Sequence, residues 1–117
     1  MRILVVEDDR TIRQMYRSAL MLAGFDVDAV DDGLAALRRL EEDRPDLVVL
    51  DLHLPRVDGL SVLGELRATS ATCDIPVVVV TGTSFQPALT DATAVLEKPC
   101  DPDRILAVIS RHLKPAA

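Results

Sequence analysis

Short apolar runs that recur along the chain constrain its fold more than any other feature of the sequence. Three of them are rich in β-branched residues and contain no charged residue: Ile3–Val6, Leu47–Leu50 and Pro76–Val80. Such runs are typical of parallel strands that are buried on both faces. Phe25–Val30, which alternates apolar and acidic residues, and the short run Ala94–Leu96 are predicted as outer strands. The sequence therefore predicts five strands.

Helical patterns fill the intervals between these strands. Apolar residues at spacings of three and four predict the helices Thr11–Ala23, Gly33–Asp43, Leu60–Ala68 and Pro102–Leu113. Asp101 and Pro102 favour a helix start at the last of them. Thr11 and Gln14 are suited to a capping box at the first. Strands and helices that alternate with short connections predict an α/β fold, a doubly wound parallel sheet with helices on both faces.

Length and composition fit a single folded domain over residues 1–117. Apolar residues make up 49% of the chain and charged residues 27%, which is the balance of a globular protein. No apolar run approaches the roughly 18 to 20 residues that span a membrane, and no signal peptide precedes the first strand. Cys73 and Cys100 have neither disulfide-like nor metal-site spacing, so we expect free thiols and a cytoplasmic location.

Net charge narrows the range of partners. The formal charge is −6 at pH 7, so the domain as a whole repels nucleic-acid backbones and anionic lipid surfaces. We therefore expect neither direct nucleic-acid binding nor membrane insertion.

Polar residues stand where the predicted strands end. Glu7 and Asp8 follow the first strand, Asp51 the third, Thr81 the fourth and Lys98 the fifth. The carboxyl ends of parallel strands meet at one edge of a sheet, so these side chains should converge. Clustered carboxylates repel one another and suit a hard divalent cation such as Mg²⁺, which keeps several waters. Lys98 and Thr81 would offer a positive charge and a hydroxyl to the oxygens of a bound anion.

Each of these residues taken alone would be read as an ordinary solvated loop or strand end. Their coincidence at several strand ends of one predicted sheet favours a binding site instead.

Four segments resemble the signature blocks of bacterial response-regulator receiver domains, the CheY-like family. They are ILVVEDD (Ile3–Asp9), LVVLDLHLPRVDG (Leu47–Gly59), VVVVTG (Val77–Gly82) and LEKP (Leu96–Pro99). The resemblance covers nearly the whole chain and keeps the order of the polar residues. It implies a flavodoxin-like sheet with strand order 2-1-3-4-5.

The resemblance also implies roles for the acidic residues. Asp51 matches the phosphoacceptor of the family. Glu7 and Asp8 match the acidic pair that holds Mg²⁺ together with Asp51, and the backbone carbonyl of His53 matches the remaining protein ligand. The imidazole of His53 is expected to face solvent.

The remaining site residues follow from the same comparison. Thr81 matches the switch hydroxyl and Lys98 the phosphate-binding lysine, and the peptide bond before Pro99 is expected to be cis. A receiver takes a phosphoryl group from the phosphohistidine of a sensor histidine kinase or histidine phosphotransfer protein. It then switches its contacts with a downstream protein, here unidentified, and is a phosphoacceptor rather than an enzyme.

Two other classes of function stay open. One is a receiver-like adaptor that binds partners without phosphorylation. The other is a metal-dependent phosphatase with a strand-end nucleophile, although such enzymes usually carry a second acid where this chain has His53.

One region departs from the family. The segment 82–97 is shorter than usual and contains Pro87, so the helix before the fifth strand, the family's fourth, should be short or absent. Val95 occupies the position of the family's usual aromatic residue. A stand-alone receiver is expected in preference to one excised from a longer chain.

Three arginines share one side of the first predicted helix. Arg10, Arg13 and Arg17 recur at spacings of three and four. A solvated face and a contact with the phosphodonor explain this pattern equally well.

Overall fold

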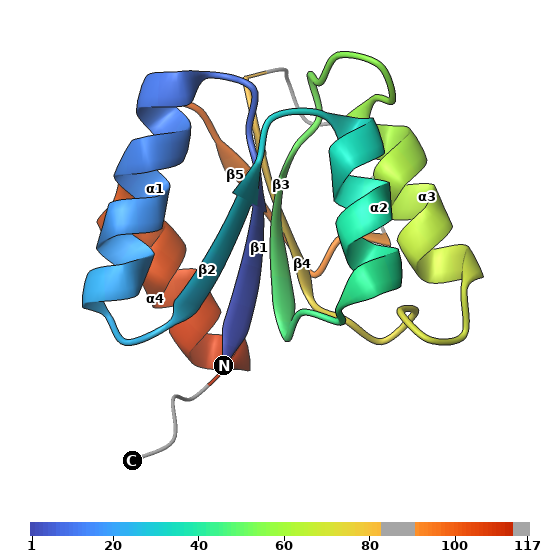
Figure 1. The fold of residues 1–117 in the computed structure, drawn as a ribbon. Helices are drawn as coiled ribbons and strands as arrows, with labels where there is room; N and C mark the ends of the chain where they lie inside the picture. The colour runs from blue at the N-terminus through green and yellow to red at the C-terminus, as the bar shows by residue number, and fades with distance from the viewer. Residues whose placement is uncertain (83–90, 114–117) are drawn as a thin grey trace.

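The structure is a computed structural model and describes residues 1–82 and 91–113. Within these ranges the chain alternates strands and helices (Figure 1). The elements are β1 (Arg2–Val6), α1 (Arg10–Leu22), β2 (Asp26–Val30), α2 (Gly33–Glu42), β3 (Leu47–Asp51), α3 (Gly59–Ala68), β4 (Val77–Thr81), β5 (Ala94–Glu97) and α4 (Pro102–His112). Each of them was predicted, and no end differs from the prediction by more than one residue. The helix between β4 and β5 was predicted to be short or absent. This prediction concerns residues 83–90, which lie outside the described residues.

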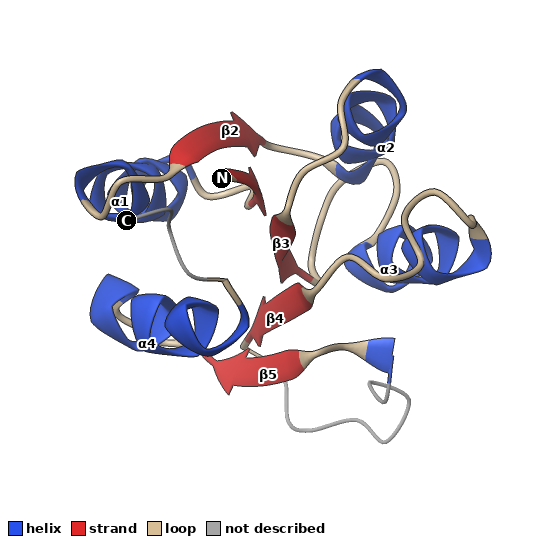
Figure 2. Cartoon of the chain, turned by 90° about the horizontal axis from the view of Figure 1, so that it is seen from below, coloured by secondary structure: helices blue, strands red, loops and turns tan. Residues whose placement is uncertain are grey.

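The five strands form one parallel sheet. Their order is β2-β1-β3-β4-β5, which confirms the predicted flavodoxin-like topology. Helices α1 and α4 cover one face of the sheet and α2 and α3 the other (Figure 2). The winding reverses between β1 and β3, so the crevice at their carboxyl ends is the expected ligand site.

Alternation along each strand divides the apolar core into two layers. In β1, Ile3 and Val5 pack under α1 and α4, whereas Leu4 and Val6 pack under α2 and α3. The central strands β3 and β4 alternate in the same way, and all their residues are buried. Because both faces are covered, polar side chains of the central strands are left to the strand ends.

Aspartates cap the described helices. The N-cap residues are Asp9, Asp32, Asp58 and Asp101. The predicted cap at Asp101 is therefore confirmed. The predicted capping box of Thr11 and Gln14 is wrong, because α1 begins one residue earlier and the Asp9 side chain accepts from the Ile12 N–H at 3.0 Å. A carboxylate also interacts favourably with the positive end of the helix dipole, which a threonine hydroxyl does less well.

Two glycines let the loop after β3 pack closely. A Cβ on Gly59 would lie 2.3 Å from the carbonyl oxygen of Asp51 and 2.5 Å from the Cα of Leu52. A Cβ on Gly33 would lie 1.8 Å from the carbonyl oxygen of Val57. The N-termini of α2 and α3 therefore both press against the segment that follows Asp51.

We expect Gly59→Ala to lower the free energy of unfolding by about 2 kcal/mol or more, because the new methyl group overlaps backbone atoms that cannot move aside. Gly64→Ala is the matched control, since Gly64 is an exposed residue of α3 at which an added Cβ would meet no atom within 4 Å. That control should stabilise the protein by about 0.5–1 kcal/mol. Urea denaturation measures both, and equal effects would contradict the close packing at Gly59.

Candidate functional site

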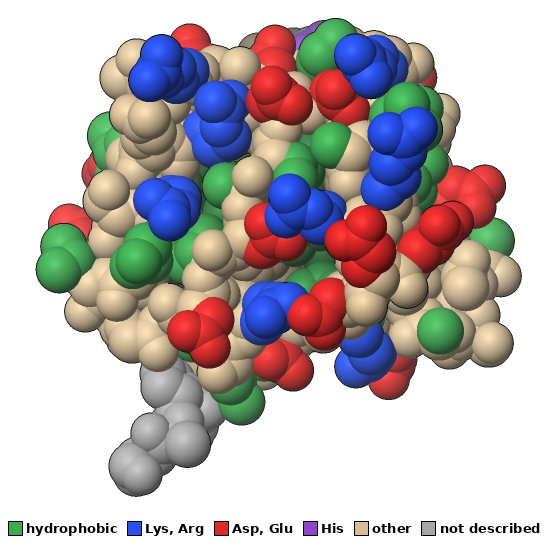
Figure 3. All heavy atoms as spheres, viewed as in Figure 1, with side chains coloured by type: hydrophobic (Ala, Val, Ile, Leu, Met, Phe, Trp, Pro, Cys, Tyr) green, Lys and Arg blue, Asp and Glu red, His purple; other side chains and the backbone are tan. Residues whose placement is uncertain are grey.

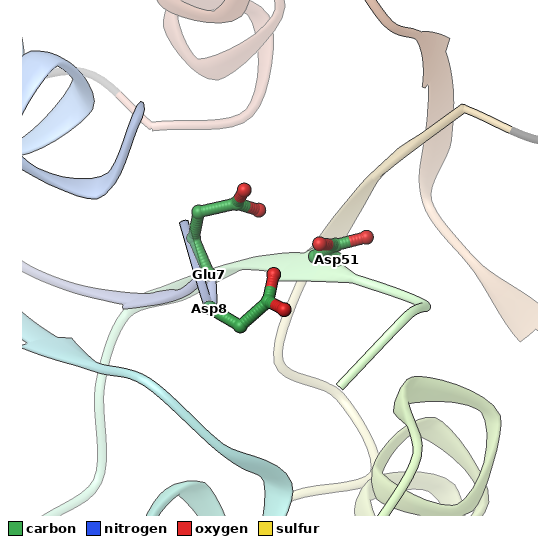
Figure 4. Close-up of side chains that lie close together, drawn as sticks. All are labelled: Glu7, Asp8 and Asp51. Carbon is green, nitrogen blue, oxygen red and sulfur yellow. The ribbon is translucent and has the colours of Figure 1, made fainter. Parts of the chain in front are cut away.

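Three carboxylates gather at the carboxyl edge of the sheet (Figure 4). Glu7 and Asp8 follow β1, and Asp51 is the last residue of β3. One oxygen atom from each lies within 4.8 Å of the others. Glu7 and Asp51 are buried and Asp8 is exposed, so the cluster opens to solvent on one side. The convergence predicted for these acids is confirmed.

Strand periodicity explains why the buried charges meet. Glu7, Asp51 and Lys98 each lie two residues beyond a side chain in the layer under α1 and α4, namely Val5, Val49 and Leu96. Side chains two residues apart point to the same face of a strand. The apolar pattern that buries the strands thus also aims these three charged groups toward one another.

Lys98 bridges the two buried acids. Its Nζ donates to both Glu7 carboxylate oxygens, at 2.9 and 3.1 Å, and to Asp51 Oδ2 at 3.2 Å. Its backbone N–H donates to the Thr81 carbonyl oxygen at 2.9 Å, which ties the start of its loop to β4. One ammonium group therefore offsets part of the repulsion between two buried carboxylates.

The pKa values of this ion pair are shifted. Burial raises the pKa of Glu7 to about 7, and the neighbouring Asp51 adds to this rise while the hydrogen bond from Lys98 opposes it. Burial alone would lower the pKa of Lys98, but its hydrogen bond to Glu7 and the charge of Asp51 outweigh burial and raise it. Lys98 is therefore protonated at neutral pH.

The other predicted site residues lie at the same edge of the sheet as Asp51. The backbone N–H of His53 donates to Asp51 Oδ1 at 3.1 Å, and the residue is exposed, as expected for a solvent-facing imidazole. Thr81 ends β4 and is 1% exposed. Its neighbour Val80 pairs with Asp51 in the sheet, so Thr81 lies at the same edge. The peptide bond between Lys98 and Pro99 is cis, as predicted.

Helix α1 contributes contacts that the sequence analysis did not identify. Arg13 Nη1 donates to the carbonyl oxygens of Glu7 and Asp8, at 3.0 and 3.3 Å. Arg10 and Arg17 are exposed, whereas Arg13 is half-buried. Helical spacing correctly put the three arginines on one side of α1, but it carries no signal for the backbone atoms that one of them reaches.

The arrangement favours a nucleophilic carboxylate beside a cation site. Both Asp51 oxygens accept hydrogen bonds, from His53 on one side and Lys98 on the other, so the carboxylate is held in one orientation. The donor set of carboxylate oxygens is that of a hard divalent cation.

Comparison with known proteins shows the family of the chain. The family described as the response regulator receiver domain matches residues 3–110. The chain belongs to this family. The family membership predicted from the four sequence blocks is therefore confirmed.

Relatives and solved structures of receivers resemble the chain over almost all of its length. Response regulator MprA of Mycobacterium avium is 42% identical over 123 residues, which cover 98% of this chain and 53% of that protein. Response regulator MprA of Mycobacterium leprae is 41% identical over 119 residues, covering 97% and 51%. This receiver chain thus spans about half the length of these relatives.

Among solved structures, chemotaxis response regulator CheY4 of Vibrio cholerae superposes with a TM-score of 0.88 at 28% identity, covering 96% of this chain and 98% of that one. The signal receiver domain of a signal transduction histidine kinase from Syntrophus aciditrophicus gives a TM-score of 0.87 at 28% identity, covering 96% and 89%. The chain therefore shares the fold of both structures over nearly all of its length.

We expect Mg²⁺ to raise the melting temperature through the acidic cluster, because a ligand of the native state stabilises it by mass action. Asp8→Asn should weaken Mg²⁺ affinity by about tenfold or more, so that more Mg²⁺ is needed for the same rise in melting temperature. Without metal the same variant should melt no lower than the parent protein, since it relieves repulsion among the acids. Thermal melts over a Mg²⁺ titration measure both effects.

Glu65→Gln is the control for the lost charge, because Glu65 is an exposed residue of α3 outside the cluster. It should respond to Mg²⁺ as the parent protein does. A metal site would be excluded if Mg²⁺ did not change the melting temperature of the parent protein. It would also be excluded if Mg²⁺ raised the melting temperature of Asp8→Asn as much as that of the parent protein.

Proposed function

We propose that this chain is a phosphoaccepting receiver that takes a phosphoryl group onto Asp51 from a phosphohistidine. The donor is a sensor histidine kinase or a histidine phosphotransfer protein. The observation that carries the proposal is the buried Asp51 carboxylate, oriented by Lys98 and the His53 N–H, in a member of the receiver family.

Asp51 is the nucleophile of the proposed transfer. One of its oxygens forms the new bond to phosphorus as the bond from phosphorus to the donor imidazole nitrogen breaks, and the imidazole leaves with the electron pair. The Lys98 ammonium, already 3.2 Å from Asp51 Oδ2, offsets the negative charge on the transferring oxygens. Water later hydrolyses the acyl phosphate and restores the carboxylate.

Four groups would hold Mg²⁺ at this site. They are the carboxylates of Glu7, Asp8 and Asp51 and the backbone carbonyl of His53. The proximity of the three carboxylates supports this set, because uncompensated acids at such separations repel one another. Bound Mg²⁺ supplies positive charge that stabilises the developing charge on the phosphoryl oxygens.

Thr81 is the proposed first responder to phosphorylation. It lies at the end of β4, at the edge where Asp51 would carry the phosphoryl group. The added charge and acceptor oxygens favour a hydroxyl donor turned toward them, so phosphorylation would act first on Thr81 at the end of β4.

The distribution of surface charge supports a protein, and not a nucleic acid, as the downstream partner. On the face in Figure 3, Lys and Arg side chains alternate with Asp and Glu and do not merge into one basic field. The net charge of −6 also opposes direct nucleic-acid contact. In the described residues, no helix combines the length and apolarity needed to cross a membrane.

We propose that the phosphoryl transfer takes place in the cytoplasm. We also propose that residues 1–117 form one receiver domain. Cys73 and Cys100 are both free, which suits a reducing compartment. The signal passes on through protein contacts with a downstream partner.

Incubation with Mg²⁺ and a small acyl phosphate should add one phosphoryl group, detected by intact mass. Asp51→Asn should abolish the addition, because an amide cannot form the acyl phosphate. Asp26→Asn is the matched control: Asp26 is exposed and begins β2, at the opposite edge of the sheet.

Labelling of Asp51→Asn at the parent level would move the phosphoacceptor elsewhere. A folded parent protein that takes up no phosphoryl group from acyl phosphate or a phosphohistidine donor would favour the alternative, an adaptor that binds partners without phosphorylation.

A further inference from the structure

Helix α1 contacts both halves of the site through hydrogen bonds to the backbone. Arg13 donates to the carbonyl oxygens of Glu7 and Asp8, and the Tyr16 hydroxyl donates to the carbonyl oxygen of Cys100 at 3.0 Å. Arg13 and Tyr16 are three residues apart and so lie on the same side of the helix. One rigid helix thus contacts both the turn that carries Glu7 and Asp8 and the lysine loop, which we define as residues 98–100.

Arg13 acts on the acidic pair through the chain and not through the carboxylates. Its Nη1 contacts the two carbonyls of the turn between β1 and α1, so the turn can rotate little about its backbone. The backbone fixes the direction of each Cα–Cβ bond, so these bonds limit the directions open to the Glu7 and Asp8 carboxylates. The planar guanidinium loses little freedom in making such bonds.

Tyr16 acts on the loop that carries Lys98. Tyr16 is 2% exposed and packs in the layer under α1 and α4. The accepting carbonyl belongs to Cys100, two residues after Lys98 and one before Asp101, the N-cap of α4. Burial raises the pKa of Tyr16 to about 12, so the hydroxyl keeps its proton at neutral pH.

The lysine loop is therefore held by hydrogen bonds at both ends, at Lys98 and at Cys100. The Lys98 N–H is bonded to the Thr81 carbonyl on the β4 side, and the Cys100 carbonyl is bonded to Tyr16 on the α1 side. Between these anchors, Lys98 projects its ammonium group onto Glu7 and Asp51.

We propose that Arg13 and Tyr16 are positioning residues, Arg13 for the Glu7–Asp8 pair and Tyr16 for Lys98. Only the consequence for phosphoryl transfer rests on the proposed function. The positioning itself is measurable without any phosphoryl group.

The first test compares Arg13→Met with Arg17→Met by Mg²⁺ titration of the intact protein. Arg17 is exposed one turn later on the same helix, so it controls for lost charge on α1. Removing a cation near a metal site by itself tightens Mg²⁺ binding. Positioning predicts the opposite for Arg13→Met, an affinity about tenfold weaker, with partial recovery in Arg13→Lys. Tighter binding, or binding equal to that of Arg17→Met, would overturn the role of Arg13.

The second test removes only the hydroxyl group, in Tyr16→Phe. Ser110→Ala is the control, because the Ser110 hydroxyl also donates to a carbonyl, that of Leu106, but on an exposed part of α4. In a double-mutant cycle with Lys98→Met, unfolding constants from urea denaturation should show coupling of about threefold or more for Tyr16. They should show no coupling for Ser110. Additive effects for Tyr16 would overturn its role.

The third measurement separates this inference from the proposed function. At saturating Mg²⁺ we expect Tyr16→Phe to slow labelling by acyl phosphate about fivefold or more, a loss of transition-state stabilisation of about 1 kcal/mol. Its Mg²⁺ affinity should not fall, because Lys98 is not a metal ligand and a displaced ammonium group competes less for Glu7 and Asp51. Labelling at the parent rate would contradict the role of Tyr16. A parent protein that is labelled neither by acyl phosphate nor by a phosphohistidine donor refutes the proposed function, while the Mg²⁺ titration and the mutant cycle still decide the positioning.

Discussion

The ion pair of Lys98 with two buried carboxylates is the interaction on which the site depends. Two like charges about 4 Å apart repel by roughly 4 kcal/mol at the effective dielectric of a partly buried site, so Glu7 and Asp51 could not share this volume unaided. One ammonium group within 3.2 Å of both offsets only part of their charge. With the exposed Asp8 beside them, the site keeps a net negative charge that favours a divalent cation.

The packing of the sheet maintains this charge arrangement. In a strand the side chains alternate between faces, so a slip of one residue in β1 or β3 would turn Glu7 or Asp51 to the other side of the sheet. The two apolar layers prevent such a slip, because it would also move every apolar residue of the strand into the wrong layer. Core packing and site geometry thus have a single cause, the register of the parallel strands.

Much of this could be predicted from the sequence, because periodicity and strand ends are local properties. The apolar runs predicted the strands, and the polar residues after them predicted which side chains converge. The capping box at Thr11 was wrong because Thr11 and Asp9 are both suitable caps, and only the geometry of the turn selects Asp9. The contact of Tyr16 with Cys100 joins residues 84 positions apart, and no periodicity specifies which backbone atom a side chain reaches across such a separation.

The contacts of Lys98 would also link the proposed metal binding to the proposed phosphoryl transfer. The ammonium group is divided between Glu7 and Asp51, and its hydrogen bonds to Glu7 are the shorter ones. A phosphoryl group on Asp51 would compete with Glu7 for this ammonium group. If the acidic cluster held a divalent cation, as proposed, its charge would offset that of Glu7, and Lys98 could turn from Glu7 to the phosphoryl oxygens without leaving a buried carboxylate uncompensated. In the proposed function, Lys98 would thus be free to stabilise the transferring group once the charge of Glu7 is offset.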